Sequence, residues 1–190
     1  MKTIIAAILF LPMLTQAQNT IKPAKCNYEI NGVDAFTGEA KKTSQWFNIS
    51  GEAQPVIQLQ LMQEGDNYFI NLALSPYEFS PSRYIQGLQG YDMPDSLGGN
   101  NLKVKLANGQ VLSFRLLTNH TLNSSIYTSN IITNNYSAIY SISKEQLEQL
   151  ASQNVTKARV YHDNGYYYEL NNIDAPSRDT FKNNAACMLQ

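Results

Sequence analysis

Apolar and polar residues alternate through most of this chain, and short turns rich in glycine and asparagine separate the alternating segments. Between Leu102 and Leu116, apolar residues occupy every second position, stop at Ala107-Asn108-Gly109 and then resume. Period two is the pattern of a half-buried β-strand, because successive side chains point to opposite faces of a sheet. The chain is therefore expected to fold mainly as antiparallel hairpins.

The length of this turn decides which side chains face the core. With a two-residue loop, Val104 lies opposite the polar Ser113, whereas a three-residue loop at Ala107-Asn108-Gly109 places it opposite Leu112. A slip of one residue sends every side chain of a strand to the other face, so the hydrophobic pattern specifies the register. We therefore expect a type I turn with Gly109 in the left-handed conformation.

A second three-residue loop is expected at Asp163-Asn164-Gly165. It places Arg159 opposite Glu169 and Tyr161 opposite Tyr167 on one face of the hairpin. The other face then carries Ala158, Val160, His162, Tyr166, Tyr168 and Leu170. Directly opposed charged and aromatic pairs each contribute a few tenths to about 1 kcal/mol, which supports this register.

Other segments add strands to the same sheet. Ile57–Leu61 and Tyr68–Leu74 are expected to form a hairpin with an even-numbered loop, either Glu64-Gly65 alone or Gln63–Asp66. Further strands are expected at Tyr136–Ile142, Asn27–Ile30 and Ser44–Ile49, the last two flanking a turn at Asp34–Gly38.

Two helices are expected late in the chain. Ser143 and Gln146 form a capping box that opens the first helix, and Asn154 ends it. Asp174 or Ser177 caps the second. The inward-facing residues of the two helices are expected to be Leu147, Leu150, Ala151, Phe181, Ala185 and Met188.

Together these elements predict an α+β fold that is mostly β, with an antiparallel sheet of about eight strands and two late helices. Because the order at the end is strand, helix, hairpin, helix, we expect the helices to cover one face of the sheet. A β-sandwich with peripheral helices is the alternative.

The first seventeen residues have the layout of a secretory signal peptide. A positive start is followed by the apolar run Ile4–Leu14 and by small residues before Gln18. The apolar run is much shorter than the roughly 20 residues that cross a bilayer. We expect residues 1–17 to be removed and residues 18–190 to form a single domain, periplasmic or secreted, with no membrane span.

Cys26 and Cys187 are the only cysteines, and they lie near opposite ends of the exported part. In an oxidising compartment such a pair is expected to form a disulfide. Closing so large a loop contributes on the order of 5 kcal/mol in the chain-entropy model. Two buried free thiols are the alternative.

Several segments give the chain a resemblance to a known group of proteins. The run Tyr140–Leu150, then Val155–Tyr161, and the turn Asp34–Gly38 resemble small exported proteins common in Bacteroidota. That resemblance implies export and an envelope compartment. Since such proteins carry no assigned activity, it transfers no site residues.

The sequence contains no nucleophile elbow, zinc-protease motif or phosphate-binding loop, so no catalytic residue, metal site or cofactor is expected. His120 and His162 are the only histidines, and we interpret them as loop surface and a strand end. Asp92 and Asp95 are the nearest candidates for paired carboxylates, but we interpret them as turn caps. A net charge of −1 without any basic run argues against nucleic acid as a partner.

One candidate surface is the connection from Ser75 to Asn101, which is long for a compact domain. Its aromatic and basic residues are Tyr77, Phe79, Arg83, Tyr84 and Tyr91. Aromatic residues with arginine are favoured at recognition surfaces. The alternative is an ordinary loop that covers a sheet edge, with a short strand at Tyr84–Leu88.

The second candidate surface is the outward face of the last hairpin, with Arg159, Tyr161, Tyr167 and Glu169. Flat aromatic rings beside polar groups can stack on a sugar or a peptide. The alternatives are a solvated sheet face or packing under the last helix, in which case the tyrosines belong to the core.

These observations favour a non-catalytic, exported domain that binds a protein, peptide or glycan partner in the cell envelope. An envelope hydrolase with a carboxylate site that matches no motif is the alternative.

Overall fold

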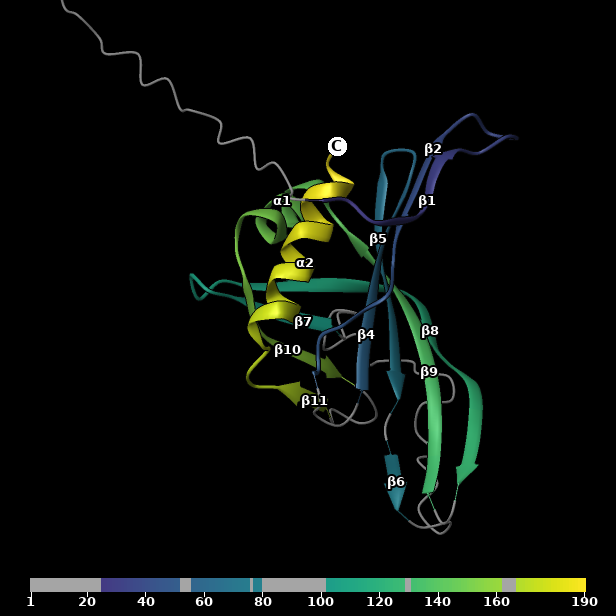
Figure 1. Cartoon of the computed structure of the whole chain (residues 1–190), viewed down its shortest axis with the longest axis vertical. Coiled ribbons are helices and arrows are strands. Elements are labelled where there is room, and N and C mark those ends of the chain that lie inside the picture. Colours follow the sequence, from purple (N-terminus) through teal and green to yellow (C-terminus); the bar gives the residue numbers. More distant parts are fainter. Residues whose placement is uncertain (1–24, 52–55, 76, 80–101, 129–130, 162–166) are drawn as a thin grey trace, which may run out of the picture.

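Figure 1 shows the computed structural model, which describes residues 25–51, 56–75, 77–79, 102–128, 131–161 and 167–190. The elements in these ranges are β1 (Tyr28–Val33), β2 (Ala40–Ser44), β3 (Phe47–Asn48), β4 (Val56–Glu64), β5 (Asn67–Ser75), β6 (Tyr77–Phe79), β7 (Leu102–Leu106), β8 (Val111–Thr128), β9 (Ile131–Ile142), α1 (Lys144–Ser152), β10 (Val155–Tyr161), β11 (Tyr167–Leu170) and α2 (Ala175–Met188).

All of the described strands belong to one antiparallel sheet. Its order is β1-β2-β4-β5-β9-β8-β7-β10-β11, while β3 pairs with β4 and β6 pairs with β9. The expected fold class, α+β and mostly β with two late helices, is confirmed. The eleven described strands exceed the expected eight in part because the short strands β3 and β6 occupy places beside longer partners.

The sheet bends along β8, which pairs with two different neighbours. Its first residues, from Val111 to Phe114, pair with β7, and from Arg115 onward it pairs with β9. Three register shifts interrupt the pairing with β9, and such bulges increase the local twist of a strand. In Figure 1 the start of β8 runs across the direction of β4 and β5. We call β7, β10 and β11 the short arm, and β1–β6 with β9 the long arm.

The two helices fill the angle between the arms and create one core (Figure 1). Helix α2 packs against β3 and β4 of the long arm and against β10 of the short arm. Phe181 of α2 is buried, and its ring centroid lies 5.4 Å from that of Phe47. Because one strand path joins the two arms, the molecule is a bent sheet with helices on one face and not a β-sandwich.

The predicted register of the β7–β8 hairpin is confirmed. Val104 pairs with Leu112, Leu102 pairs with Phe114, and Gly109 has a φ of 89°. Packing decided this register, since the alternating residues Leu102, Val104, Leu106, Leu112 and Phe114 are all buried in the core.

The register of the β10–β11 hairpin is also confirmed. Arg159 pairs with Glu169, and Tyr161 pairs with Tyr167. The loop itself, with His162 and Tyr166, lies outside the described residues.

The predicted loop of the β4–β5 hairpin is wrong by a shift of two residues. Both expected loops would pair Leu61 with Tyr68, whereas Leu61 pairs with Ile70 and Glu64 pairs with Asn67. The loop is therefore Gly65-Asp66, with Gly65 at a φ of 57°. A shift of two keeps every side chain on its face, so the hydrophobic pattern cannot detect it.

The expected strands near the N-terminus need a similar correction. The strand expected at 44–49 is divided, since β2 ends at Ser44 and β3 covers Phe47–Asn48. Strands β1 and β2 instead pair directly across the predicted turn at 34–38, with Val33 opposite Ala40.

Both predicted helix starts are present. Ser143 and Gln146 form the capping box of α1, whose C-cap is Gln153, one residue before the expected end. Asp174 caps α2, because its Oδ1 accepts the Ser177 N–H at 2.7 Å. Within the described ranges, no helix is long and apolar enough to cross a membrane.

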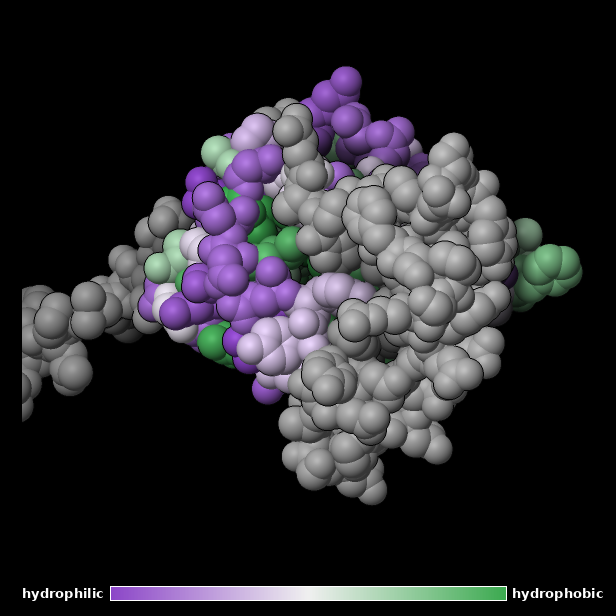
Figure 2. Space-filling model, turned by 90° about the horizontal axis from the view of Figure 1, so that it is seen from below, coloured by the Kyte–Doolittle hydropathy of each residue, from purple (hydrophilic) through white to green (hydrophobic). Residues whose placement is uncertain are grey.

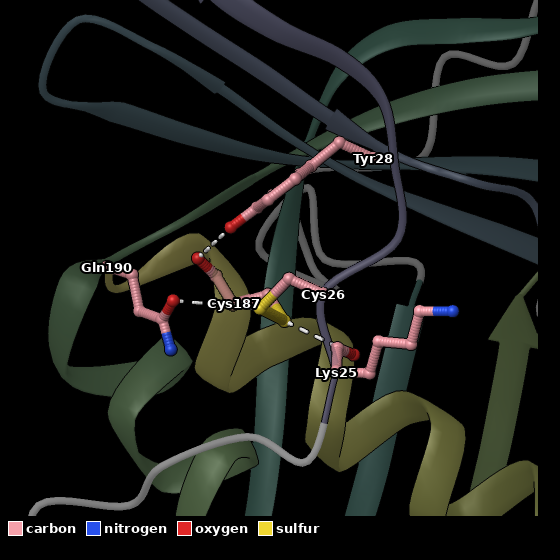
Figure 3. Close-up of a disulfide and its surroundings, with 5 residues drawn as sticks. All are labelled: Lys25, Cys26, Tyr28, Cys187 and Gln190. Atoms are coloured by element: carbon pink, nitrogen blue, oxygen red, sulfur yellow. Dashed lines mark hydrogen bonds between the residues drawn. A yellow bond between two sulfur atoms is a disulfide. The ribbon is translucent and has the colours of Figure 1, made fainter.

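The expected disulfide joins Cys26 to Cys187, with Cα atoms 5.6 Å apart (Figure 3). Tyr28 reinforces the link, since its hydroxyl donates to the Cys187 carbonyl at 2.8 Å, and burial raises the pKa of this tyrosine. Disulfide sulfurs carry no hydrogen, so the Gln190 and Lys25 oxygens at 3.7 and 3.9 Å are close contacts rather than acceptors. The bridge therefore ties the start of the described chain to the end of α2.

Candidate functional site

The outer face of the short arm is a polar surface on the side of the sheet opposite the helices. The alternation of β10 and β11 buries Ala158, Val160 and Leu170 in the core. The intervening residues point outward, so the last helix does not cover the tyrosines, and Tyr167 is 47% exposed. We call this surface the polar face; it comprises Lys103, Lys105, Lys157, Arg159, Tyr161, Tyr167 and Glu169. In Figure 2, hydrophilic residues gather on the left, the side on which β10 and β11 lie in Figure 1.

Arg159 organises the aromatic part of the polar face. Its Nε donates to Glu169 Oε2 at 2.7 Å, its second terminal nitrogen also contacts that oxygen, and one terminal nitrogen donates to the Tyr161 hydroxyl at 3.1 Å. Its Cζ lies 4.3 Å from the centroid of the Tyr167 ring. The two tyrosine rings are tilted by 56° with centroids 5.6 Å apart. The rings are therefore held in place before any ligand arrives.

The hydrogen bonds of Arg159 also affect its charge. The bond to Tyr161 and then the bonds to Glu169 raise the pKa of this arginine further above its usual range, so the side chain stays cationic. The ion pair with Glu169 is partly exposed, with side chains 38% and 23% accessible, and such surface pairs contribute about 1 kcal/mol or less. Its main effect is to fix geometry.

Like charges lie directly opposite each other across β7 and β10. Lys105 pairs with Lys157, and Lys103 pairs with Arg159. Such pairs are destabilising in a sheet. Among the described residues, none of the three lysines has a carboxylate within salt-bridge distance; Lys157 donates to Asn171 at 3.0 Å, and Lys103 lies 5.3 Å from the Tyr161 ring centroid.

A shallow depression of about 250 Å³ lies within the polar face. Its lining is Lys103, Val104, Lys105, Val111, Lys157, Ala158, Arg159 and Glu169. Four of these side chains are cationic and one is a carboxylate, whereas the whole chain has a net charge of −1. The surface can therefore attract an anion and offer flat rings beside it.

A second depression, of about 230 Å³, lies beside the β1–β2 turn and contains several carboxylates. Asp34 accepts from the N–H groups of Thr37 and Phe36 at 2.9 Å, and these bonds lower its pKa. Glu64 pairs with Lys41 at 3.1 Å. Asp34 thus acts as a turn cap, and a lowered pKa is the opposite of what a general acid needs.

Of the predicted site residues, Arg159, Tyr161 and Tyr167 come together on the polar face. Tyr77 and Phe79 belong to β6, which pairs with β9 in the long arm, so they are not part of this surface. Arg83, Tyr84 and Tyr91 lie outside the described residues, as do the expected strand 84–88 and the carboxylates Asp92 and Asp95.

The expectation for His120 is wrong. His120 was expected on a loop, but its backbone belongs to β8. Across the described ranges, no group of three histidine, cysteine or acidic residues could hold a metal ion.

Sequence reasoning missed the lysines of the polar face. Lys103 and Lys105 alternate with buried residues, which signals an outward face, but their place beside β10 depends on a pairing between distant segments. Val155 pairs with Leu106 and Val160 with Leu102, and no local turn specifies this register.

Comparison with known proteins gives no further guide to this surface. No protein-family model matches the chain, and neither the curated proteins nor the solved structures contain a significant match.

Proposed function

We propose that this chain is an exported, non-catalytic domain that binds a partner of the cell envelope on its polar face. The observation that carries the proposal is the Arg159 network, which holds Tyr161 and Tyr167 in fixed positions on a cationic surface. A fixed aromatic surface is suited to binding because little side-chain entropy is lost when the ligand arrives.

Three features support the envelope as the place of action. The first seventeen residues have the layout of a signal peptide. The Cys26–Cys187 disulfide suits an oxidising compartment. The resemblance to small exported proteins of Bacteroidota points to the same location.

The test is retention of envelope material by the immobilised mature protein, residues 18–190. Polysaccharide and protein fractions of an envelope extract are passed separately over wild type and over an Arg159→Ala/Tyr161→Ala/Tyr167→Ala variant. A Val33→Ala/Phe36→Ala variant is the control, because these exposed residues lie on the β1–β2 hairpin, away from the polar face.

We expect the wild type and the control to retain the same ligand and the polar-face variant to lose it. Retention that is equal for all three proteins would contradict the proposed role of the polar face. Circular dichroism and thermal unfolding check that each variant folds.

A further inference from the structure

We infer that the ligand of the polar face is an anionic polysaccharide, an inference that rests on the proposed function. Three lysine side chains surround a depression that contains a single carboxylate, Glu169. That carboxylate is already paired with Arg159, so the lysine charges remain uncompensated within the described part of the chain.

The sheet fixes the spacing of these charges. Neighbouring strands lie about 4.8 Å apart, and residues two apart along a strand are separated by roughly 6.7 Å. Lys103 and Lys105 are two apart on β7, and Lys157 lies opposite Lys105 on β10. The cations therefore form a grid that spans two strands, which suits a ligand with repeated negative charges better than a single small anion.

Relief of the repulsion between like charges adds to the binding energy of an anionic ligand. The pairs Lys105–Lys157 and Lys103–Arg159 repel each other in the free protein. An anion placed between them replaces repulsion with attraction. Binding of a negatively charged partner to the polar face would therefore explain why the like-charge pairs are present.

The shape of the surface favours a glycan over an acidic peptide. Peptide and protein partners gain most of their binding energy from a few anchors, mainly aromatic residues and arginine, that are buried in well-packed pockets. The depression has only Val111, Val104 and Ala158 as apolar lining, and the last two are almost fully buried. The exposed Tyr167 ring, stacked on Arg159, instead offers a flat apolar surface with polar groups at its edge, which matches a sugar ring.

The test is calorimetric titration of the mature protein with four probes of similar length. Oligogalacturonate carries carboxylates, a heparin-derived oligosaccharide carries sulfates, cello-oligosaccharide is neutral, and oligoglutamate is an acidic peptide. We expect both anionic oligosaccharides to bind more tightly than the other two, with affinity that falls as salt is added. The relative affinities of oligogalacturonate and the heparin-derived oligosaccharide show whether the polar face prefers carboxylate or sulfate groups.

Three variants locate the binding. Lys103→Gln/Lys105→Gln/Lys157→Gln is expected to weaken binding of the anionic oligosaccharide about tenfold, the order expected for three screened charge contacts. The matched control, Lys42→Gln/Lys144→Gln/Lys182→Gln, removes the same net charge elsewhere and should change the affinity less than twofold. Tyr167→Ala should weaken the oligosaccharides and leave oligoglutamate unchanged.

The outcomes distinguish failure of the anionic-polysaccharide inference from failure of the proposed function. If the neutral oligosaccharide or oligoglutamate binds as tightly, or if envelope material is retained by the polar face while neither anionic oligosaccharide binds, the anionic-polysaccharide inference is overturned and the proposed function stands. If the two lysine variants weaken binding equally, the attraction is one of net charge and the inference is overturned. If neither probes nor envelope material binds, both proposals fall.

Discussion

The two faces of the β10–β11 hairpin share one backbone and differ in almost everything else. The inner face presents Ala158, Val160 and Leu170 to the core beneath α2. The outer face presents Arg159, Tyr161, Tyr167 and Glu169, joined by hydrogen bonds and ring contacts. Because side chains alternate along a strand, a single hairpin can hold the fold together on one side and keep an ordered surface on the other.

Exposure alone does not identify a site. Phe36 is 99% exposed at the tip of the β1–β2 hairpin, and Val33 is 69% exposed. Their exposure exceeds that of Tyr167, yet Tyr167 belongs to a network that fixes its ring. Order among exposed groups, combined with unfavourable charge pairs, distinguishes the polar face.

The largest effect on the inner side should come from loss of the disulfide that fastens the end of α2. The Cys26→Ser/Cys187→Ser variant is expected to lose stability on the order of 5 kcal/mol in the chain-entropy model. Urea unfolding of wild type and variant measures the difference. A loss below about 1 kcal/mol would show that the residual structure of the unfolded chain, and not the crosslink, dominates.

A core substitution on the inner side is expected to cause the next largest loss of stability. Phe181→Ala removes a buried ring that packs on Phe47, and such changes cost about 3 to 5 kcal/mol. Tyr167→Ala on the outer face should cost about 1 kcal/mol or less, because that ring is half-exposed. Equal losses in urea unfolding would erase the proposed division between the two faces.

On the outer face, one substitution is expected to increase the stability of the protein by a smaller amount. Lys105→Glu turns the like-charge pair with Lys157 into an opposite-charge pair, so stability should rise by a few tenths to about 1 kcal/mol. Lys42→Glu is the matched control, since Lys42 lies opposite the neutral Asn31 and Gln63. Thermal unfolding at low and high salt measures the change in stability of each variant. An increase in stability that is the same for Lys105→Glu and Lys42→Glu would refute the pairing argument.

The smallest expected effect is a pH dependence of stability that arises from Asp174, the cap of α2. Hydrogen bonds from the side chain and then the backbone of Ser177 lower the pKa of Asp174, the cap of α2. Because the pKa of Asp174 is lower in the folded protein than its usual value of 3.8, the ionised carboxylate stabilises the fold at pH values above 3.8. This stabilisation is lost as the pH falls through the pKa of the folded state. In Asp174→Asn the cap no longer titrates, so its melting temperature should approach that of the wild type below pH 3.8. A constant difference in melting temperature from pH 2 to 6 would contradict this assignment.

Local pattern was enough to predict much of this fold. The β7–β8 and β10–β11 registers were predictable because a one-residue slip would bury Ser113 or Arg159. The capping box at Ser143 was readable for a similar reason, since it needs only residues one turn apart.

The rest depends on information that is not local. The loop of the β4–β5 hairpin escaped prediction because a two-residue slip keeps every face unchanged. The lysine grid escaped because it requires β7 to pair with β10, segments about fifty residues apart. For the candidate site, the aromatic half was therefore predictable and the cationic half was not.

The central claim is that the outer face of the short arm binds an anionic ligand while the inner face serves the core. The most direct test is an NMR titration of residues 18–190 with oligogalacturonate, following backbone amide shifts. We expect little change in the β1–β2 hairpin and the largest shifts at Lys103, Lys105, Lys157, Arg159 and Tyr167. Shifts that concentrate in that hairpin or in residues 80–101, and leave the polar face unchanged, would contradict it.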